Sequence, residues 1–346
     1  MKWDRIIAAG LAVSLCWGAG TVAAHANDTS AVLKTGGLVF VRSDTIEMEE
    51  EDLFISMDET RVDYVFRNRT EEDVRSIVAF PMPEIASSPY SMVSIPWFGE
   101  GHPQGDNIFG FSVEIDGVAV EPTLEMRASA ANLDVTEDLI AAGIPVNHLA
   151  PGIDDQLAAL DEATKADWIA RGILHHEFYE DGDTRVDYFW PLWSLRATYW
   201  WWSTFPANER MRVSHRYTPS VGGTAGVSFL NSDGSPGGYD FEGYQRRYCM
   251  DGPFLRALEN ATRQSGQEYP PFTESWISYV LTTGGNWAGT IGRFTLTIDK
   301  GAPENFISFC GEGVEKIGPT TFRMVKEDFY PQNDLDVLIM RRFEME

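Results

Sequence analysis

The chain has 346 residues, of which 43% are hydrophobic and 12% are aromatic. This much apolar material excludes an intrinsically disordered protein, and the length corresponds to about two domains of roughly 150 residues each. The chain carries 27 basic and 52 acidic residues, which gives a net charge of −25. A field of this sign repels phosphate backbones, so we expect no nucleic-acid partner.

The first 26 residues have the pattern of a secretory signal peptide, namely basic Lys2 and Arg5, an apolar run over 6–19, and small Ala24 and Ala26 at the exit. This pattern predicts cleavage after Ala26 and a periplasmic or secreted protein. The apolar run is shorter than the roughly 20 residues that span a bilayer. No later stretch is continuously apolar, so we expect no transmembrane helix in the mature chain.

Removal of this leader leaves two cysteines, Cys249 and Cys310, in a compartment where disulfides persist. We expect them to be bonded to each other, and the alternative is two separate buried thiols. The chain has no C-x-x-C motif, which argues against a thiol oxidoreductase.

The first half of the mature chain is predicted to be rich in strands. Within 60–68, the apolar residues Val62, Tyr64 and Phe66 alternate with polar ones, which predicts a strand with one buried face. Asp116 and Gly117 mark a tight hairpin turn. The expected strands of this half are 37–41, 53–56, 60–68, 74–80, 109–115, 118–120, 185–190, 195–205 and 211–217.

Residues from about 127 to 174 are rich in Ala, Leu and Asp and are predicted to form a helical insertion. Helices are expected to begin at Thr136 and near Asp161, and to end at Gly143 and Gly172. Such an insertion covers a sheet edge or a site, or else simply packs against the sheet.

The rest of the chain begins with a Gly- and Ser-rich linker at 221–243, followed by a helix at about 253–264 with proline in its first turn. Short strands are expected at 277–282, 294–299, 306–309, 321–325 and 336–340. We therefore predict a mainly β fold of two β-sandwich-like units, 27–220 with the helical insertion and 244–346.

Several segments, in order along the mature chain, resemble an exported bacterial family known as domain of unknown function 4424. The resemblance implies an exported protein and implies no activity or catalytic residues. The segments that carry it include Asn27-Asp28-Thr29-Ser30, Gly36-Gly37-Leu38-Val39-Phe40, Glu51-Asp52-Leu53-Phe54-Ile55-Ser56, Val78-Ala79-Phe80-Pro81-Met82-Pro83, His215-Arg216-Tyr217-Thr218-Pro219-Ser220, Leu281-Thr282-Thr283-Gly284-Gly285-Asn286-Trp287 and Ser308-Phe309-Cys310-Gly311.

An aromatic run between 188 and 205 contains five of the 11 tryptophans within 13 positions. Exposed aromatic faces bind sugar rings and partner proteins, which makes Trp190, Trp193, Trp200 and Trp202 candidate ligand or partner residues. Because side chains alternate along a strand, Trp200 and Trp202 share a face that Trp201 does not. The alternative is that these rings form the core of a sandwich.

Signals for metals are weak. His175 and Glu177 would share one face of a strand, but the sequence shows no third ligand. The segment 231–235 resembles half of a calcium loop and lacks the bidentate glutamate. We therefore expect no metal and no cofactor.

The sequence lacks the G-x-S-x-G, H-E-x-x-H and G-x-x-x-x-G-K motifs of common hydrolases and nucleotide-binding proteins. We therefore interpret the protein as an exported, non-catalytic binding module for an envelope protein or a glycan. The alternative is an envelope-directed hydrolase such as a glycosidase. A glycosidase requires two carboxyl groups that face each other at about 5 to 9.5 Å.

Overall fold

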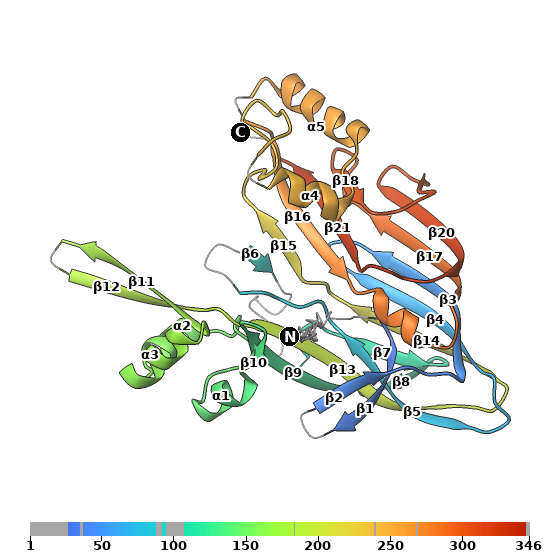
Figure 1. Cartoon of the computed structure of the whole chain (residues 1–346). Helices are drawn as coiled ribbons and strands as arrows, with labels where there is room; N and C mark the ends of the chain where they lie inside the picture. The colour runs from blue at the N-terminus through green and yellow to red at the C-terminus, as the bar shows by residue number, and fades with distance from the viewer. Residues whose placement is uncertain are drawn as a thin grey trace, which may run out of the picture.

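The computed structural model describes residues 27–34, 37–87, 92–94, 107–182, 184–238, 240–267 and 269–343. The predicted leader lies outside the described residues. The fold is mainly β, as predicted, and consists of three larger sheets, one two-stranded hairpin and five α-helices among the described residues (Figure 1). No helix within the described ranges combines the length and apolar character needed to cross a bilayer.

The largest sheet has eight strands in the order β19-β20-β17-β3-β4-β14-β7-β8. Strand β17 pairs with β3 in parallel, and the other neighbours are antiparallel. This sheet therefore contains strands from both sides of the predicted linker. Its strands are β3 (Ile46–Ile55), β4 (Thr60–Asn68), β7 (Ser112–Ile115), β8 (Val118–Val120), β14 (Arg210–Tyr217), β17 (Ile291–Asp299), β19 (Glu315–Lys316) and β20 (Thr321–Phe329).

Two further sheets pack on the inner face of the eight-stranded sheet. The six-stranded sheet has the order β10-β9-β13-β5-β1-β2, and the five-stranded sheet has the order β18-β21-β16-β15-β6. The six strands are β1 (Thr29–Lys34), β2 (Gly37–Val41), β5 (Val74–Pro81), β9 (Thr123–Ala130), β10 (Leu133–Asp134) and β13 (Ser194–Phe205). The five strands are β6 (Met92–Ser94), β15 (Val221–Thr224), β16 (Phe272–Tyr279), β18 (Phe306–Phe309) and β21 (Leu335–Arg342).

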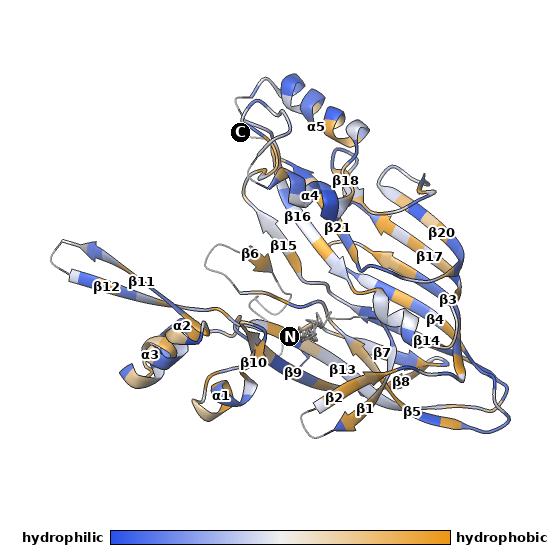
Figure 2. Ribbon diagram, in the orientation of Figure 1, coloured by the Kyte–Doolittle hydropathy of each residue, from blue (hydrophilic) through white to orange (hydrophobic). Residues whose placement is uncertain are grey.

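The main core fills the space between the three sheets and takes residues from all of them. The alternation predicted for 60–68 is confirmed, since Val62, Tyr64 and Phe66 are each no more than 1% exposed. Figure 2 shows the same alternation of hydrophobic and hydrophilic residues along the strands of the eight-stranded sheet. The predicted sandwich-like packing is therefore present, with one sheet facing two others.

The predicted insertion contains three helices, α1 (Thr136–Ala141), α2 (Ile153–Ala158) and α3 (Glu162–Ala170). Their buried residues pack with β9 and with Trp193 in a separate core. The structure differs from the prediction before Thr136, where 127–134 belongs to strands β9 and β10 and not to a helix. Strand β9 lies between β10 and β13, and this pairing outweighs the helical preference of its alanine-rich sequence.

Helices α4 (Phe241–Tyr248) and α5 (Gly252–Ser265) cover the outer face of the five-stranded sheet. Helix α5 confirms the helix predicted at 253–264, and the carboxylate of Asp251 caps it by accepting the Phe254 N–H at 2.8 Å. The segment predicted as a linker, 221–243, follows β14 of the eight-stranded sheet and includes strand β15 and the first residues of α4.

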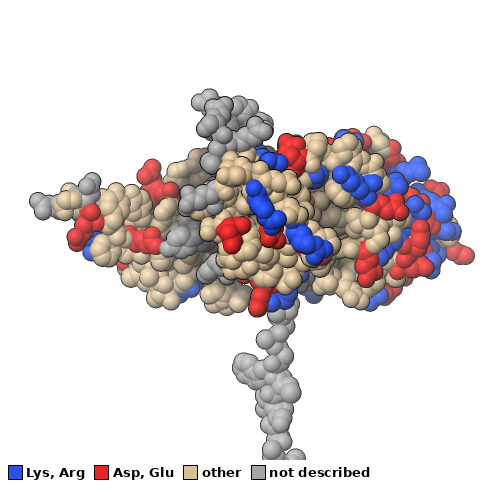
Figure 3. Space-filling view, turned by 90° about the horizontal axis from the view of Figure 1, so that it is seen from above, with Lys and Arg blue, Asp and Glu red and all other residues tan. Residues whose placement is uncertain are grey.

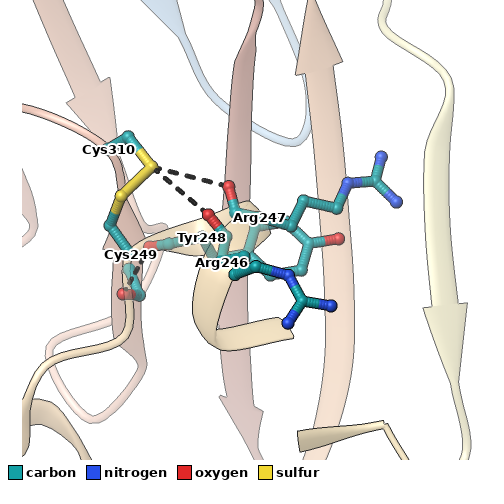
Figure 4. The surroundings of a disulfide bond; sticks show 6 residues. Arg246, Arg247, Tyr248, Cys249 and Cys310 are labelled. Atoms are coloured by element: carbon teal, nitrogen blue, oxygen red, sulfur yellow. Dashed lines mark hydrogen bonds between the residues drawn. A yellow bond between two sulfur atoms is a disulfide. The ribbon is translucent and has the colours of Figure 1, made fainter. Parts of the chain in front are cut away.

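Cys249 and Cys310 form the predicted disulfide, with their Cα atoms 5.0 Å apart. Cys249 ends helix α4, and Cys310 directly follows strand β18 (Figure 4). The Sγ atom of Cys310 lies 3.6 Å from the carbonyl oxygen of Arg247 in the last turn of α4. The bond therefore ties α4 to the edge of the five-stranded sheet.

Candidate ligand-binding site

A cavity of about 770 Å³ lies between the helical insertion, the base of the β11–β12 hairpin and the inner face of the five-stranded sheet. The hairpin strands are β11 (Leu174–Asp181) and β12 (Thr184–Pro191). A cavity of this size is typical of sites for small molecules. Its described lining includes Ser87, His148, Leu149, Ile153, Asp154, Trp190, Pro191, Val221, Gly223, Thr273, Ser275 and Arg341.

The floor of the cavity comes from alternate residues of β16 and β21. Thr273, Ser275 and Arg341 share the face that continues into the main core, because side chains alternate along a strand. Glu274 faces the other way, and its carboxylate accepts hydrogen bonds from the Ser228 N–H at 2.5 Å and the Tyr244 hydroxyl at 2.6 Å. The floor therefore offers two hydroxyl groups and one guanidinium group to the cavity.

His148 forms part of the cavity wall, and the buried ring of Trp193 packs against it. The indole N–H of Trp193 donates to the carbonyl oxygen of Val146 at 2.9 Å, and its ring meets the His148 ring edge-on, with centroids 6.4 Å apart. Burial lowers the pKa of His148 to about 4, so the imidazole is neutral at neutral pH. Its Nδ1 atom has no hydrogen-bond partner among the described residues.

Trp190 lines the cavity and is the last member of a row of stacked rings along the hairpin. The rings of Trp190 and Tyr188 are 6.2 Å apart, and those of Tyr188 and Tyr179 are 5.6 Å apart, both pairs nearly parallel. Tyr188 and Tyr179 are 41% and 49% exposed. Figure 1 shows this hairpin projecting from the body of the molecule. The row therefore leads from solvent along the hairpin to the cavity.

The other candidate tryptophans lie elsewhere. Trp193 is fully buried behind the cavity wall, whereas Trp200 and Trp202 lie on the outer face of the six-stranded sheet. Trp201 is buried in the main core on the opposite face, so the predicted alternation of these three rings is confirmed. Of the four candidates, only Trp190 among the described residues lines the cavity.

The N-terminal hairpin β1–β2 packs on Trp200. Leu38 and Phe40 of this hairpin join Trp200 in a small apolar cluster, and the Leu38 N–H donates to the Glu125 carboxylate of β9 at 3.4 Å. Trp202 remains 51% exposed, with the Arg75 guanidinium group 4.5 Å from its ring centre. Trp200 and Trp202 therefore lie away from the cavity, and substitutions of them can serve as controls for Trp190.

The residues considered as metal ligands are hydrogen-bonded to neighbouring residues of the chain. His175 Nε2 lies 3.1 Å from Glu177 Oε1, and the carboxylate of Asp233 accepts from the backbone N–H and the hydroxyl of Ser235. The described part of the chain contains no group of three or more His, Cys, Asp or Glu side chains arranged to hold a metal ion.

A second polar region is closed and lies in the main core around Asn27. The Asn27 amide nitrogen donates to both oxygens of Glu51, at 3.1 and 3.2 Å, and the Tyr64 hydroxyl donates to the Asn27 amide oxygen at 2.5 Å. The next residue, Asp28, lies 3.0 Å from His215 Nε2. Burial raises the pKa of Glu51 to about 8 and also raises that of Asp28, although His215 opposes the second shift.

Sequence reasoning missed His148, Arg341 and the closed region. The strand pattern could have revealed the closed region. Glu51 points to the same face of its strand as Leu53 and Ile55, and His215 points to the same face as Val213 and Tyr217. A polar residue on the apolar face of a strand indicates a buried group that needs a hydrogen-bond partner. His148 lies in a loop, where no periodicity marks its direction.

Comparison with known proteins identifies the family. The family model for the domain of unknown function DUF4424 matches residues 26–338. The chain belongs to this family. No curated protein sequence matches the chain significantly. Among solved structures, the chain is similar to a Legionella pneumophila protein named a "putative nutrient binding protein", with 13% identity and a TM-score of 0.41 over 91% of this chain and 70% of the other.

The described surface carries charges of both signs. In the view from above, acidic and basic side chains are interspersed and gather over the end of the molecule formed by the eight-stranded sheet (Figure 3). Arg61, for example, lies near both Glu59 and Asp63 on this sheet. The described lining of the cavity includes the acidic residues Asp154 and Glu274 and the basic residue Arg341, and the Glu274 carboxylate is bonded to Ser228 and Tyr244.

Proposed function

We propose that the protein is exported, that its leader is cleaved after Ala26, and that it binds a neutral saccharide in the cavity beside Trp190 without transforming it. The observation that carries the proposal is the row of stacked rings, Tyr179, Tyr188 and Trp190, that ends at a cavity with hydroxyl groups in its floor. Sugar rings have apolar faces and polar edges, which such a combination of flat rings and hydroxyl groups accommodates.

The charges of the cavity favour a neutral ligand. His148 is uncharged at neutral pH because burial lowers its pKa to about 4. Asp154 and Arg341 carry opposite charges, and the carboxylate of the third charged lining residue, Glu274, is bonded to Ser228 and Tyr244 on the other face of the sheet. The side chains that face the cavity therefore have little net charge. The Nε1 atom of Trp190 and the Nδ1 atom of His148 have no hydrogen-bond partner among the described residues. A ligand hydroxyl group satisfies such atoms after a small rearrangement of the wall.

A glycosidase is less well supported than a binding protein. Hydrolysis of a glycosidic bond uses two carboxyl groups on opposite sides of the sugar. Asp154 is one acidic residue of the described lining, and the other, Glu274, has its carboxylate bonded to Ser228 and Tyr244 on the helix-covered face of the sheet. The described lining of this cavity therefore supplies no pair of facing carboxylates.

Binding is tested by titrating the mature protein with cellotriose, maltotriose and chitotriose while recording tryptophan fluorescence and heat. We expect at least one of them to bind, and Trp190→Ala to lower its affinity about tenfold or more, which corresponds to about 1.4 kcal/mol. Trp202→Ala is the matched control, because Trp202 is exposed on another sheet. Equal loss in both variants, or no binding of any saccharide, contradicts the proposal.

Export is tested by fractionating cells that produce the full chain. We expect the protein in the periplasm or medium, with a mass that corresponds to loss of the first 26 residues and with Cys249 bonded to Cys310. A protein that keeps its leader and stays in the cytoplasm contradicts this part of the proposal.

A further inference from the structure

The closed polar region around Asn27 contains more acidic than basic groups. Asp28 and Glu51 are both buried, and the imidazole of His215 is bonded to Asp28 but not to Glu51. The Tyr279 hydroxyl lies 3.5 Å from Glu51 Oε1 and 3.0 Å from the Tyr64 hydroxyl, which bonds to Asn27. No lysine or arginine hydrogen-bonds to this region in the described part of the chain. Asp28 therefore has a basic partner, and Glu51 has none among the described side chains.

Asn27 is held at this position by contacts on both its side chain and its backbone. Its side chain bonds to Glu51 and Tyr64, and its carbonyl oxygen accepts from the Thr283 hydroxyl at 2.8 Å. The carbonyl oxygen of Asp28 accepts from the Trp287 indole N–H at 2.6 Å. Strands β3, β4 and β14 and the turn after β16 all contribute, so the position of Asn27 is fixed from several directions.

We propose that cleavage after Ala26 turns the backbone nitrogen of Asn27 into an α-ammonium group that stays in this closed region and neutralises the Glu51 carboxylate. This inference rests on the proposed export and cleavage. The side-chain amide nitrogen of Asn27, Nδ2, lies 3.1 Å from Glu51 Oε2. Because that nitrogen is four bonds from the backbone nitrogen, the α-ammonium group lies within roughly 8 Å of the carboxylate.

Processing then balances the charges of the core. His215 pairs with Asp28, and the new α-ammonium group pairs with Glu51. Charges attract strongly at this separation in a buried environment, and a buried charge without a partner is costly. The first residue of the mature protein is thus a structural part of the core, and the leader-bearing chain lacks the charge that completes it.

The proposal has a defined pH dependence. With no α-ammonium group present, burial raises the pKa of Glu51 to about 8, so the folded protein prefers the protonated acid. A group whose pKa rises on folding stabilises the fold at low pH, and this stabilisation is lost as the pH rises from the unfolded value through the folded value. A blocked or extended N-terminus should therefore lose stability between about pH 5 and about pH 8, and the mature N-terminus should lose less.

The test compares two forms of the whole mature chain, one that starts at Asn27 and one that carries Gly-Ser-Gly-Ser before Asn27. Each is made with Glu51 and with Glu51→Gln, and Glu50→Gln on the exposed side of the same strand is the matched control. The thermal midpoint is measured at about pH 5 and about pH 8. We expect a larger fall in the extended form, which Glu51→Gln removes and Glu50→Gln does not.

A second measurement does not depend on any variant. The folded mature protein is treated with an amine-reactive succinimidyl ester, and the N-terminal peptide is quantified by mass spectrometry. We expect labelling of the α-amine at least about tenfold slower than in the unfolded protein, which is the ratio expected for a group held in a closed site.

The outcomes separate the inference from the proposed export. An exported protein that starts at Asn27, but whose α-amine labels at the unfolded rate, or whose two forms share one pH dependence, overturns the inference and leaves export standing. A mature N-terminus at another residue overturns both the predicted cleavage and the inference.

Discussion

The cavity beside Trp190 and the closed region around Asn27 both place polar groups among apolar ones, and they differ in how those groups are satisfied. In the closed region, Asn27 bonds to both Glu51 and Tyr64, and Asp28 bonds to His215 through one oxygen, which leaves Asp28 Oδ2 and His215 Nδ1 without a partner among the described residues. At the cavity, His148 and Trp190 each have a nitrogen without a hydrogen-bond partner among the described residues. Mutually bonded buried groups stabilise the fold, whereas unsatisfied groups beside a cavity indicate a place for a ligand.

The largest effect on stability is expected from breaking the pair in the closed region. His215→Ala leaves the Asp28 carboxylate buried without its partner, and we expect a loss of roughly 3–5 kcal/mol in the free energy of unfolding. Urea unfolding monitored by fluorescence measures it. The control His175→Ala changes a histidine whose side chain is 41% exposed and should cost less than about 0.5 kcal/mol. Equal losses would remove the distinction between the two regions.

Loss of the disulfide is expected to have the next largest effect. The double variant Cys249→Ser with Cys310→Ser opens a loop with a sequence separation of 61 residues, which on the chain-entropy model costs about 4 kcal/mol. The bond lies on the helix-covered side of the five-stranded sheet, away from the cavity floor. Saccharide affinity, measured well below the thermal midpoint, should therefore stay within about twofold of the unchanged protein. A parallel loss of affinity would show that the two faces of this sheet are coupled.

A pH-dependent effect of about 3 kcal/mol is expected at the cavity wall. Because burial lowers the pKa of His148 from its ordinary value of about 6.5 to about 4, the unfolded chain binds more protons between these values. The stability that His148 contributes is present above about pH 6.5 and is lost as the pH falls towards about 4. His148→Gln should flatten this part of the curve of unfolding free energy against pH, whereas His175→Gln should not. An unchanged curve would contradict a buried neutral imidazole at the wall.

Much of the fold follows from the sequence, because strands leave a local signature. Strand β4 and strand β8 have the predicted bounds, and the turn at Asp116 and Gly117 has positive φ at both residues, as a primed hairpin turn requires. The pairing of strands is different. The parallel contact between β3 and β17 joins segments more than 200 residues apart, and their alternation fixes which side chains are buried but not which strand lies beside which.

The site is less predictable than the fold, for a related reason. The sequence marks the aromatic run but gives Trp190, Trp193, Trp200 and Trp202 equal weight, because their different surroundings come from distant elements. His148 comes from the insertion and Arg341 from the last strand, and only the assembled sheets bring them to one cavity. Alternation within a strand tells which residues share a face, and the identity of the facing element requires the tertiary structure.

The smallest expected effect tests whether the exposed end of the aromatic row belongs to the binding site. Tyr188 stacks on Trp190 and is 41% exposed, so a saccharide longer than the cavity would contact it. Loss of one such ring contact is worth about 0.5–1.5 kcal/mol, or roughly twofold to tenfold in affinity. Tyr188→Ala should therefore weaken a trisaccharide by this factor and a monosaccharide hardly at all.

Tyr188→Phe separates stacking from hydrogen bonding in this last comparison. The variant keeps the ring and removes the hydroxyl group that lies 3.4 Å from the Tyr179 hydroxyl, so stacking alone predicts an affinity close to that of the unchanged protein. Tyr330→Ala, an exposed tyrosine that does not line the cavity, controls for general surface effects. If titration calorimetry finds equal affinities for Tyr188→Ala and Tyr330→Ala, the site ends at Trp190, and the hairpin beyond it serves another purpose than holding the ligand.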